Sequence, residues 1–160
     1  MAYFIDTECI GCTICAKKCP VECITGDVKQ LHIIDPPICI DCGVCESYCP
    51  VDCIMDQNGL KRPKIPAKNR PIAIVEESLC TACEYCIGAC PFNCLEMVGA
   101  TDGGHFKIAA NVREKDCVGC KLCEEVCIQK GAITIRWPDG TYCEELGVPC
   151  DAGGKGYYQA

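Results

Sequence analysis

The sequence lacks several features that would point to a membrane or exported protein. No uninterrupted apolar run approaches the length needed to span a membrane, so we expect no membrane insertion. The first residues, MAYFIDTECI, do not combine a basic stretch with a long apolar one, so no export signal is visible and a cytoplasmic location is expected. The two histidines, His32 and His105, stand alone and are predicted to be surface residues, not metal ligands.

Signatures of catalysis and of nucleic-acid binding are missing as well. The chain contains no paired carboxylates, no nucleophile beside a base and no glycine-rich phosphate loop. Residues 1–56 carry a net charge of -6, residues 57–75 of +5 and residues 76–160 of -6. Nucleic acid would need a basic face on a folded block, whereas here both blocks are acidic. We therefore expect neither an enzyme by itself nor a nucleic-acid partner.

Cysteine is what the sequence has in excess, with 21 in 160 residues. A secreted protein of this composition would be read as a disulfide framework, but in the reducing cytoplasm dense cysteine favours metal binding. The pattern C-x2-C-x2-C-x3-C occurs four times and includes sixteen of the cysteines. The motifs are Cys9, Cys12, Cys15, Cys19; Cys39, Cys42, Cys45, Cys49; Cys80, Cys83, Cys86, Cys90; and Cys117, Cys120, Cys123, Cys127.

A basic, proline-rich stretch, NGLKRPKIPAKNRP, divides the four motifs into two pairs. Such a stretch does not easily form a helix or a central strand. We predict a first module at residues 1–56, a linker at 57–71, a second module at 72–137 and a C-terminal extension at 138–160. The linker bases are interpreted as a solvated segment, the alternative being docking on an acidic neighbour; they are Lys61, Arg62, Lys64, Lys68 and Arg70.

Short apolar or alternating runs flank the motifs and predict strands near residues 2–5, 31–34, 72–75, 106–112 and 132–135. The residues between the third and fourth cysteines of each motif predict the start of a short helix. The predicted fold class is α+β, with short antiparallel hairpins and two short helices in each module.

The cysteine spacing also distinguishes between metals. Zinc sites typically use two C-x2-C pairs separated by a longer loop. Three cysteines at x2 and x2, followed by x3 and Cys-Pro, are instead typical of a cubane [4Fe-4S] cluster. Three closely spaced thiolates bind three corners of the cube, so the fourth corner needs a ligand from elsewhere in the chain.

Two stretches of the chain resemble the bacterial two-cluster ferredoxins. The first is AYFIDTECIGCTICAKKCPVECI followed by LHIIDPPICIDCGVCESYCPVDCI, and the second runs from IAIVEESLCTACEYCIGACPFNC to DCVGCKLCEEVCIQKGAITI. The resemblance implies a tandem 2[4Fe-4S] ferredoxin, or polyferredoxin, with four [4Fe-4S] clusters. It also implies that the fourth cysteine of each motif binds the other cluster of its module. The implied ligand sets are Cys9, Cys12, Cys15 and Cys49; Cys39, Cys42, Cys45 and Cys19; Cys80, Cys83, Cys86 and Cys127; and Cys117, Cys120, Cys123 and Cys90.

A rival topology is known from the four-cluster subunits of molybdenum reductases, in which the outer motifs pair with each other and so do the inner ones. The basic break in the middle of the chain favours the tandem order. The family's [3Fe-4S] variants lose the second cysteine of a motif, and here all four are present, which implies four-iron clusters: Cys12, Cys42, Cys83 and Cys120.

The fourth motif departs from the other three. Ile128 follows its last cysteine, where the other motifs have Pro20, Pro50 and Pro91. The segment CIQKGAI is also one residue longer than CPVECI, so Cys127 is the weakest of the predicted ligands.

Five cysteines lie outside the motifs: Cys23, Cys53, Cys94, Cys143 and Cys150. The first three each follow Cys-Pro-x-x, and Ala132 takes the corresponding place in the fourth repeat. This favours a small buried apolar position over an S–H hydrogen bond that tunes the cluster or a reserve ligand. The last two have no motif and are interpreted as free structural thiols, the alternatives being a partner-facing metal ligand or a disulfide.

These observations predict an electron-transfer protein that is a fixed relay subunit, because a free shuttle needs only one module. The layout is similar to the small iron-sulfur subunits of bacterial tungsten-dependent aldehyde oxidoreductases and tungsten benzoyl-CoA reductases, which act in anaerobic metabolism. That resemblance implies a larger tungstopterin subunit, a flavin subunit or ferredoxin as further partner, and room for self-association. The alternatives are a free polyferredoxin shuttle and a non-redox cysteine-rich metal-binding or assembly protein.

Overall fold

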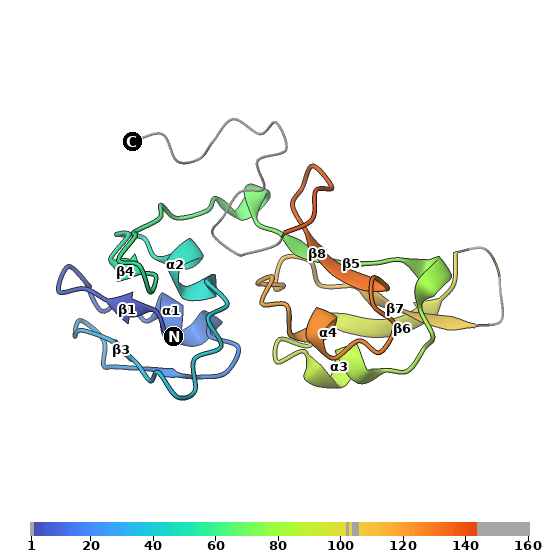
Figure 1. Ribbon diagram of the computed structural model, residues 1–160, viewed down its shortest axis with the longest axis horizontal. Coiled ribbons are helices and arrows are strands. Elements are labelled where there is room, and N and C mark those ends of the chain that lie inside the picture. The colour runs from blue at the N-terminus through green and yellow to red at the C-terminus, as the bar shows by residue number, and fades with distance from the viewer. Residues whose placement is uncertain (1, 102, 104–105, 144–160) are drawn as a thin grey trace. The chain divides into compact units, whose positions relative to one another are not determined.

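The computed structural model describes residues 2–101, 103 and 106–143 (Figure 1). His105, Cys150 and the predicted extension beyond Cys143 lie outside these residues. The described chain forms two compact units, one ending at Pro66 and the other running from Ala67 to Cys143. The division falls within the stretch 57–71 that the sequence predicts as a linker.

The first unit is built from four two-residue strands and two five-residue helices. In chain order they are β1 (Phe4–Ile5), α1 (Ile14–Lys18), β2 (Ile24–Thr25), β3 (Ile33–Ile34), α2 (Val44–Tyr48) and β4 (Ile54–Met55). Strand β1 pairs antiparallel with β4, and β2 pairs antiparallel with β3. The first and last strands of the unit therefore lie side by side, and helices α1 and α2 pack together.

The second unit repeats this order with longer strands. Its elements are the 3-10 turn η1 (Ala67–Asn69), β5 (Ile72–Val75), the 3-10 turn η2 (Glu77–Leu79), α3 (Tyr85–Ala89), β6 (Leu95–Gly99), β7 (Lys107–Asn111), α4 (Leu122–Glu125) and β8 (Ile133–Arg136). Strand β5 pairs with β8 and β6 with β7, again antiparallel. The strands of each unit pair with strands of the same unit. The arrangement is therefore the tandem one, and not the rival topology in which the outer motifs pair with each other.

The predicted α+β class with short hairpins and short helices is confirmed. The five predicted strands correspond to β1, β3, β5, β7 and β8. Strands β2, β4 and β6 were not predicted; each begins directly after a cysteine that follows a motif.

The helices are short because the motifs limit them at both ends. Each begins after a residue in the left-handed conformation, where a helix cannot continue backwards. The residues that follow helices α1, α2 and α3 are Cys19, Cys49 and Cys90. Their backbone is extended, as expected for a residue before proline. Helix α4 has no proline after it, and the residue that follows it, Val126, stays in the right-handed helical region.

Both cores are small and rich in cysteine. The buried residues of the first are Ala2, Tyr3, Cys15, Cys19, Cys23, Ile24, Ile34, Cys45, Cys49, Cys53 and Ile54. Those of the second are Ala73, Cys86, Leu95, Ala109, Cys123, Ile133, Ile135 and Cys143. Units of this size bury little apolar surface, so a cross-link in the core is expected to contribute much of their stability.

Candidate metal centres

A cavity in the first unit lies between the two motifs of that unit. Its cysteine lining consists of the first three cysteines of the first motif and the last of the second, together with Cys53: Cys9, Cys12, Cys15, Cys49 and Cys53. Aliphatic side chains such as Ile5 and Ile54 complete the walls. Helix α1 provides Cys15 and helix α2 ends at Cys49, so both motifs are needed to form this cavity.

A second cavity in this unit has the reverse composition. It is lined by the first three cysteines of the second motif and the last of the first, again with one further cysteine: Cys39, Cys42, Cys45, Cys19 and Cys23. Tyr3, Ile24 and Ile34 line it as well. The two motifs of the unit thus exchange their fourth cysteines.

The second unit repeats the exchange. A cavity of this unit is lined by Cys117, Cys120, Cys123, Cys90 and Cys94. The remaining motif cysteines, Cys80, Cys83 and Cys127, lie near Cys86. Burial raises the pKa of Cys86, and the charges of these three neighbours contribute to the rise. Each set implied by the ferredoxin resemblance is brought together in this way, including Cys127; that these residues are ligands stays a prediction.

The arrangement fits a multinuclear group better than a single ion. Within the described residues, no three His, Cys, Asp or Glu side chains converge on a point where they could bind one metal ion. A cubane cluster needs no such convergence, because each iron would bind one thiolate and the four cysteine sulfurs would lie around the cluster. Cavities with aliphatic walls and four motif thiols suit that group.

Left-handed backbone recurs at the same places in every motif. The residue before the second cysteine has φ of 54 to 69°, and the residue after it has φ of 63 to 72°; they are Gly11, Asp41, Ala82, Gly119, Thr13, Gly43, Glu84 and Lys121. This conformation costs a non-glycine residue about 1–2 kcal/mol. Such strain gathers at functional sites, and turns of this kind direct backbone N–H groups into a concave site for an anion. Gly11 illustrates this, since its N–H donates to Cys9 Sγ at 3.4 Å.

Burial keeps the deepest motif cysteines protonated. It raises the pKa of Cys15 to about 11, and the charges of neighbouring cysteines contribute to the rise. Burial likewise raises the pKa of Cys45 and of Cys123. These thiols are therefore protonated near neutral pH, and a metal bound to them would displace these protons.

The cysteines outside the motifs are buried where the structure describes them. Cys23, Cys53 and Cys94 each line one of the cavities, and Ala132 is buried at the corresponding place of the fourth repeat. Cys143 is fully buried in the second core. The twenty described cysteines form no disulfide.

The predicted surface position of His32 is wrong. Its side chain is 1% exposed and lines the cavity around Cys9, Cys12, Cys15 and Cys49. Nδ1 lies 3.1 Å from the carbonyl oxygen of Gln30, which can only accept, so Nδ1 donates. Nε2 is buried and has no hydrogen-bond partner among the described residues. The run LHII does not indicate this burial, because apolar Leu31 and Ile33 mark the opposite face, and only the structure shows that the face of His32 and Ile34 is the buried one.

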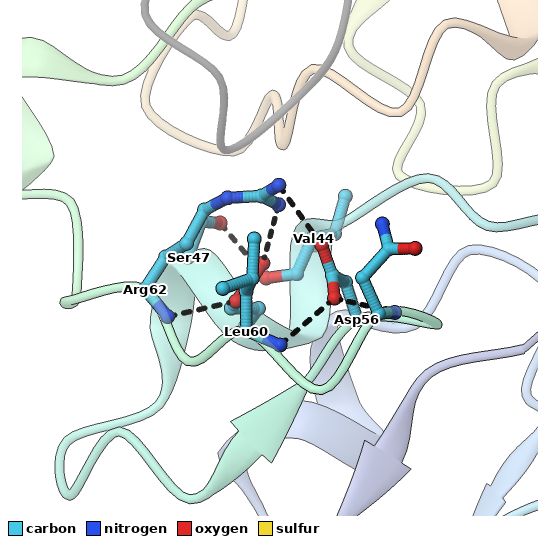
Figure 2. Close-up of polar contacts among 7 residues, drawn as sticks. Val44, Ser47, Asp56, Leu60 and Arg62 are labelled. Atoms are coloured by element: carbon cyan, nitrogen blue, oxygen red, sulfur yellow. Dashed lines mark hydrogen bonds and ion pairs between the residues drawn. The ribbon is translucent and has the colours of Figure 1, made fainter.

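The bases of residues 61–64 are not a solvated linker. Arg62 forms ion pairs with Glu46 (3.2 Å) and Asp56 (3.0 Å), and its backbone N–H donates to Glu46 Oε1 at 2.9 Å. Asp56 in turn accepts from the backbone N–H groups of Asn58 and Leu60 (Figure 2). We call Glu46, Asp56 and Arg62 the carboxylate clamp. It fastens residues 56–62 to α2, the helix whose ends carry cysteines of both cavities.

Lys61 and Lys64 also contact the first unit. Lys61 pairs with Asp6 at 2.7 Å and with Glu8, and the backbone N–H of Lys64 donates to Asp52 Oδ1 at 2.8 Å. The acidic neighbour that these bases contact is thus their own module, which the sequence did not indicate.

Known domain families match in both units. Residues 79–131 match the 4Fe-4S dicluster domain, and residues 32–55 match the 4Fe-4S binding domain. The chain therefore carries 4Fe-4S ferredoxin-type domains in tandem.

Within the described residues, no helix has both the length and the apolar character that crossing a membrane requires.

Similar proteins include components of oxidoreductase complexes. One component of the ion-translocating oxidoreductase complex from Azoarcus sp. (strain BH72) is 49% identical over 37 residues, which are 22% of this chain and 20% of that protein. The same component from Thiobacillus denitrificans is 56% identical over 32 residues, 19% of this chain and 17% of that protein. The chain thus spans about a fifth of the length of the curated relatives it matches.

Among solved structures, a chain of the formate dehydrogenase, heterodisulfide reductase and formylmethanofuran dehydrogenase complex from Methanospirillum hungatei is also similar. The match covers 93% of this chain and 54% of that one, at 20% identity and a TM-score of 0.42.

Proposed function

We propose that this chain is an electron-transfer protein that binds four [4Fe-4S] clusters, two in each unit, through the sixteen motif cysteines. The observation that supports it is the exchange of fourth cysteines between paired motifs, each cavity being lined by three cysteines of one motif and one of another. A [4Fe-4S] cluster supplies one-electron redox chemistry when it is bound. The chain contributes no catalytic group of its own to this function.

The residues around the cavities would hold the clusters and set their potentials. Left-handed turns direct N–H groups inward, as Gly11 does toward Cys9, and such donors offset the negative charge of thiolates and sulfides. Aliphatic walls such as Ile5 and Ile54 keep water from the sulfurs. The chain has a net charge of -7, and the thiolates would make the loaded protein more acidic still. A redox partner with a basic docking surface is therefore favoured.

We further propose that the chain is the electron-relay subunit of a multi-subunit oxidoreductase. The similarity to components of ion-translocating oxidoreductase complexes supports this level of the proposal. At a finer level we propose a tungstopterin catalytic subunit as one partner, with a flavin subunit or a ferredoxin as the other, in the cytoplasm. Anoxic copurification of the native complex tests it: tungsten in the copurifying subunit agrees with the finer proposal, and its absence contradicts it.

The cluster content is tested on anaerobically purified protein. We expect about sixteen irons per chain and cubane EPR signals on reduction. Zinc without iron would contradict the electron-transfer function and support a non-redox metal-binding protein.

A matched pair of variants separates ligation from packing. Cys123 and Cys143 are both buried in the second unit, and Cys123 lines the cavity between the third and fourth motifs. Cys123→Ser is expected to lower the iron content, whereas Cys143→Ser should leave it at the wild-type value. Equal iron content in the two variants would contradict the assignment of Cys123 as a ligand.

A further inference from the structure

In three of the four motifs, the last cysteine is contacted by a buried cysteine from outside the motif. Cys23 Sγ lies 3.4 Å from Cys19 Sγ, and Cys53 Sγ lies 3.6 Å from Cys49 Sγ. In the second unit, the backbone N–H of Cys94 donates to Cys90 Sγ at 3.4 Å. These three cysteines, Cys23, Cys53 and Cys94, are 4%, 2% and 1% exposed, and we call them the second-row thiols.

The local backbone explains why the contact recurs. Each second-row thiol follows the motif cysteine by four residues, and the residue before it is left-handed: Glu22, Asp52 and Asn93, with φ of 53, 49 and 50°. This turn reverses the chain, so that its N–H and side chain face the motif sulfur. At Cys23 the N–H also donates to Cys19 Sγ at 3.4 Å, so one residue directs two donors at one sulfur.

Chemistry decides which sulfur is the donor. Between two free thiols either sulfur could donate. A motif cysteine bound to iron is a thiolate and has no hydrogen left, so only the second-row thiol can donate. A free cysteine buried in apolar surroundings keeps its hydrogen near neutral pH, so each second-row thiol has a hydrogen to donate.

Cys94 Sγ donates to the carbonyl oxygen of Phe92 at 3.7 Å, so its S–H is directed away from Cys90. We propose that Cys23 and Cys53 each donate an S–H···S hydrogen bond to the iron-bound sulfur of their motif cysteine, and that this bond raises the reduction potential of one particular cluster. The bond persists through the electron transfer, and no covalent bond forms or breaks. Reduction adds negative charge to the cluster and its sulfurs, so the bond is stronger in the reduced state and favours it. The inference rests on the proposed clusters.

Because motifs exchange their fourth cysteines, each thiol acts on the cluster of the other motif. Cys23 acts through Cys19 on the centre of Cys39, Cys42 and Cys45, whose cavity it lines. Cys53 acts through Cys49 on the centre of Cys9, Cys12 and Cys15. In the second unit the S–H of Cys94 is directed to Phe92, and Ala132 takes the corresponding place in the fourth repeat, so the two centres of the first unit are tuned in this way and those of the second are not.

Alanine and serine variants of the full-length protein form the test, because the two side chains have similar size and only serine keeps a donor. In Cys23→Ala, one of four reduction equivalents should move to lower potential in an EPR-monitored titration. The shift should reach at most about tenfold in the reduction equilibrium constant, which is 59 mV for one electron. Cys23→Ser should keep that equivalent near its wild-type potential. In the variant with Cys23 and Cys53 both changed to Ala, two equivalents should move, whereas Cys94→Ala, the matched control, should move none.

Three results would overturn the proposal. Unchanged potentials in a fully iron-loaded alanine variant would show that the thiol donates nothing. Equal shifts in the alanine and serine variants would assign the effect to packing. Loss of one cluster in Cys23→Ala with retention in Cys19→Ala would make Cys23 the ligand. Failure of the proposed function looks different, because the wild-type protein would then lack the four clusters before any variant is made.

Discussion

Replacing Arg62 by methionine tests the carboxylate clamp directly. The substitution keeps an unbranched side chain but removes the charge between Glu46 and Asp56. Their side chains are 1% and 7% exposed, and that of Arg62 is 16% exposed. Without the guanidinium, two buried carboxylates would face each other beside helix α2, so we expect the first unit to lose stability and to lose its clusters faster than the wild type.

The magnitude follows from burial and from the proton that Glu46 can take up. Removing one partner of a buried ion pair costs about 3–5 kcal/mol. Burial already raises the pKa of Glu46 to about 7, although Arg62 works to lower it. Without Arg62 this carboxyl becomes neutral near pH 7, which limits the loss to about 3 kcal/mol. If that loss falls on the unfolding step, cluster release should be about 100-fold faster.

The assay is the rate at which visible cluster absorbance disappears in guanidinium under anoxic conditions, a measure of kinetic stability. Arg113→Met is the matched control, because Arg113 pairs with Glu96 at 3.3 Å but the two side chains are 48% and 57% exposed. An exposed pair is worth about 0–1 kcal/mol, so this rate should change less than about tenfold. Adding Glu46→Gln and Asp56→Asn to Arg62→Met should restore part of the stability. Equal rates for Arg62→Met and Arg113→Met would refute the reasoning.

Four further outcomes are expected. Gly11→Ala should lose the clusters of the first unit, because a Cβ there would lie 2.3 Å from a backbone nitrogen, whereas Ala82→Gly at the equivalent place should keep full iron content. Burial works to raise the pKa of Asp56, but backbone N–H donors and Arg62 outweigh it and lower the pKa. The stabilisation by Asp56 is therefore present above about pH 4 and is lost as pH falls, so the release rates of wild type and Asp56→Asn should converge in acid. Cys12→Ala should cost about half of the iron and not a quarter, since both cavities of a unit share its two motifs. Iron-free protein should lose amide dispersion in NMR spectra, and native-like dispersion would contradict the role of the metal in folding.

The parts of the site that the sequence predicted are those encoded by local spacing. Three cysteines within seven residues must face one cavity, and proline after the fourth ends the helix there. The stretch LKRPK was misread because its composition is that of a linker, and nothing local indicates that Arg62 meets Glu46, sixteen residues away. The surface position of His32 was predicted from its polarity, and the run LHII, which has apolar residues on both faces, does not show which face is buried. Strands of two residues such as β2 and β4 are too short to show a period.

The exchange of fourth cysteines has a consequence for how a unit is assembled. Helix α1 begins beside one cavity, where Cys15 lies, and ends beside the other, at Cys19. Helix α2 does the same in the opposite sense with Cys45 and Cys49, so each cavity is lined by cysteines at the ends of both helices. These helices have five residues, far fewer than an isolated helix needs in water. The left-handed residue before α1, Thr13, adds strain, whereas Gly43 before α2 adopts this conformation at little cost. With the proposed clusters in both cavities, a unit so built would gain its stability from the two clusters at once, and in this way so small a core would support such short helices.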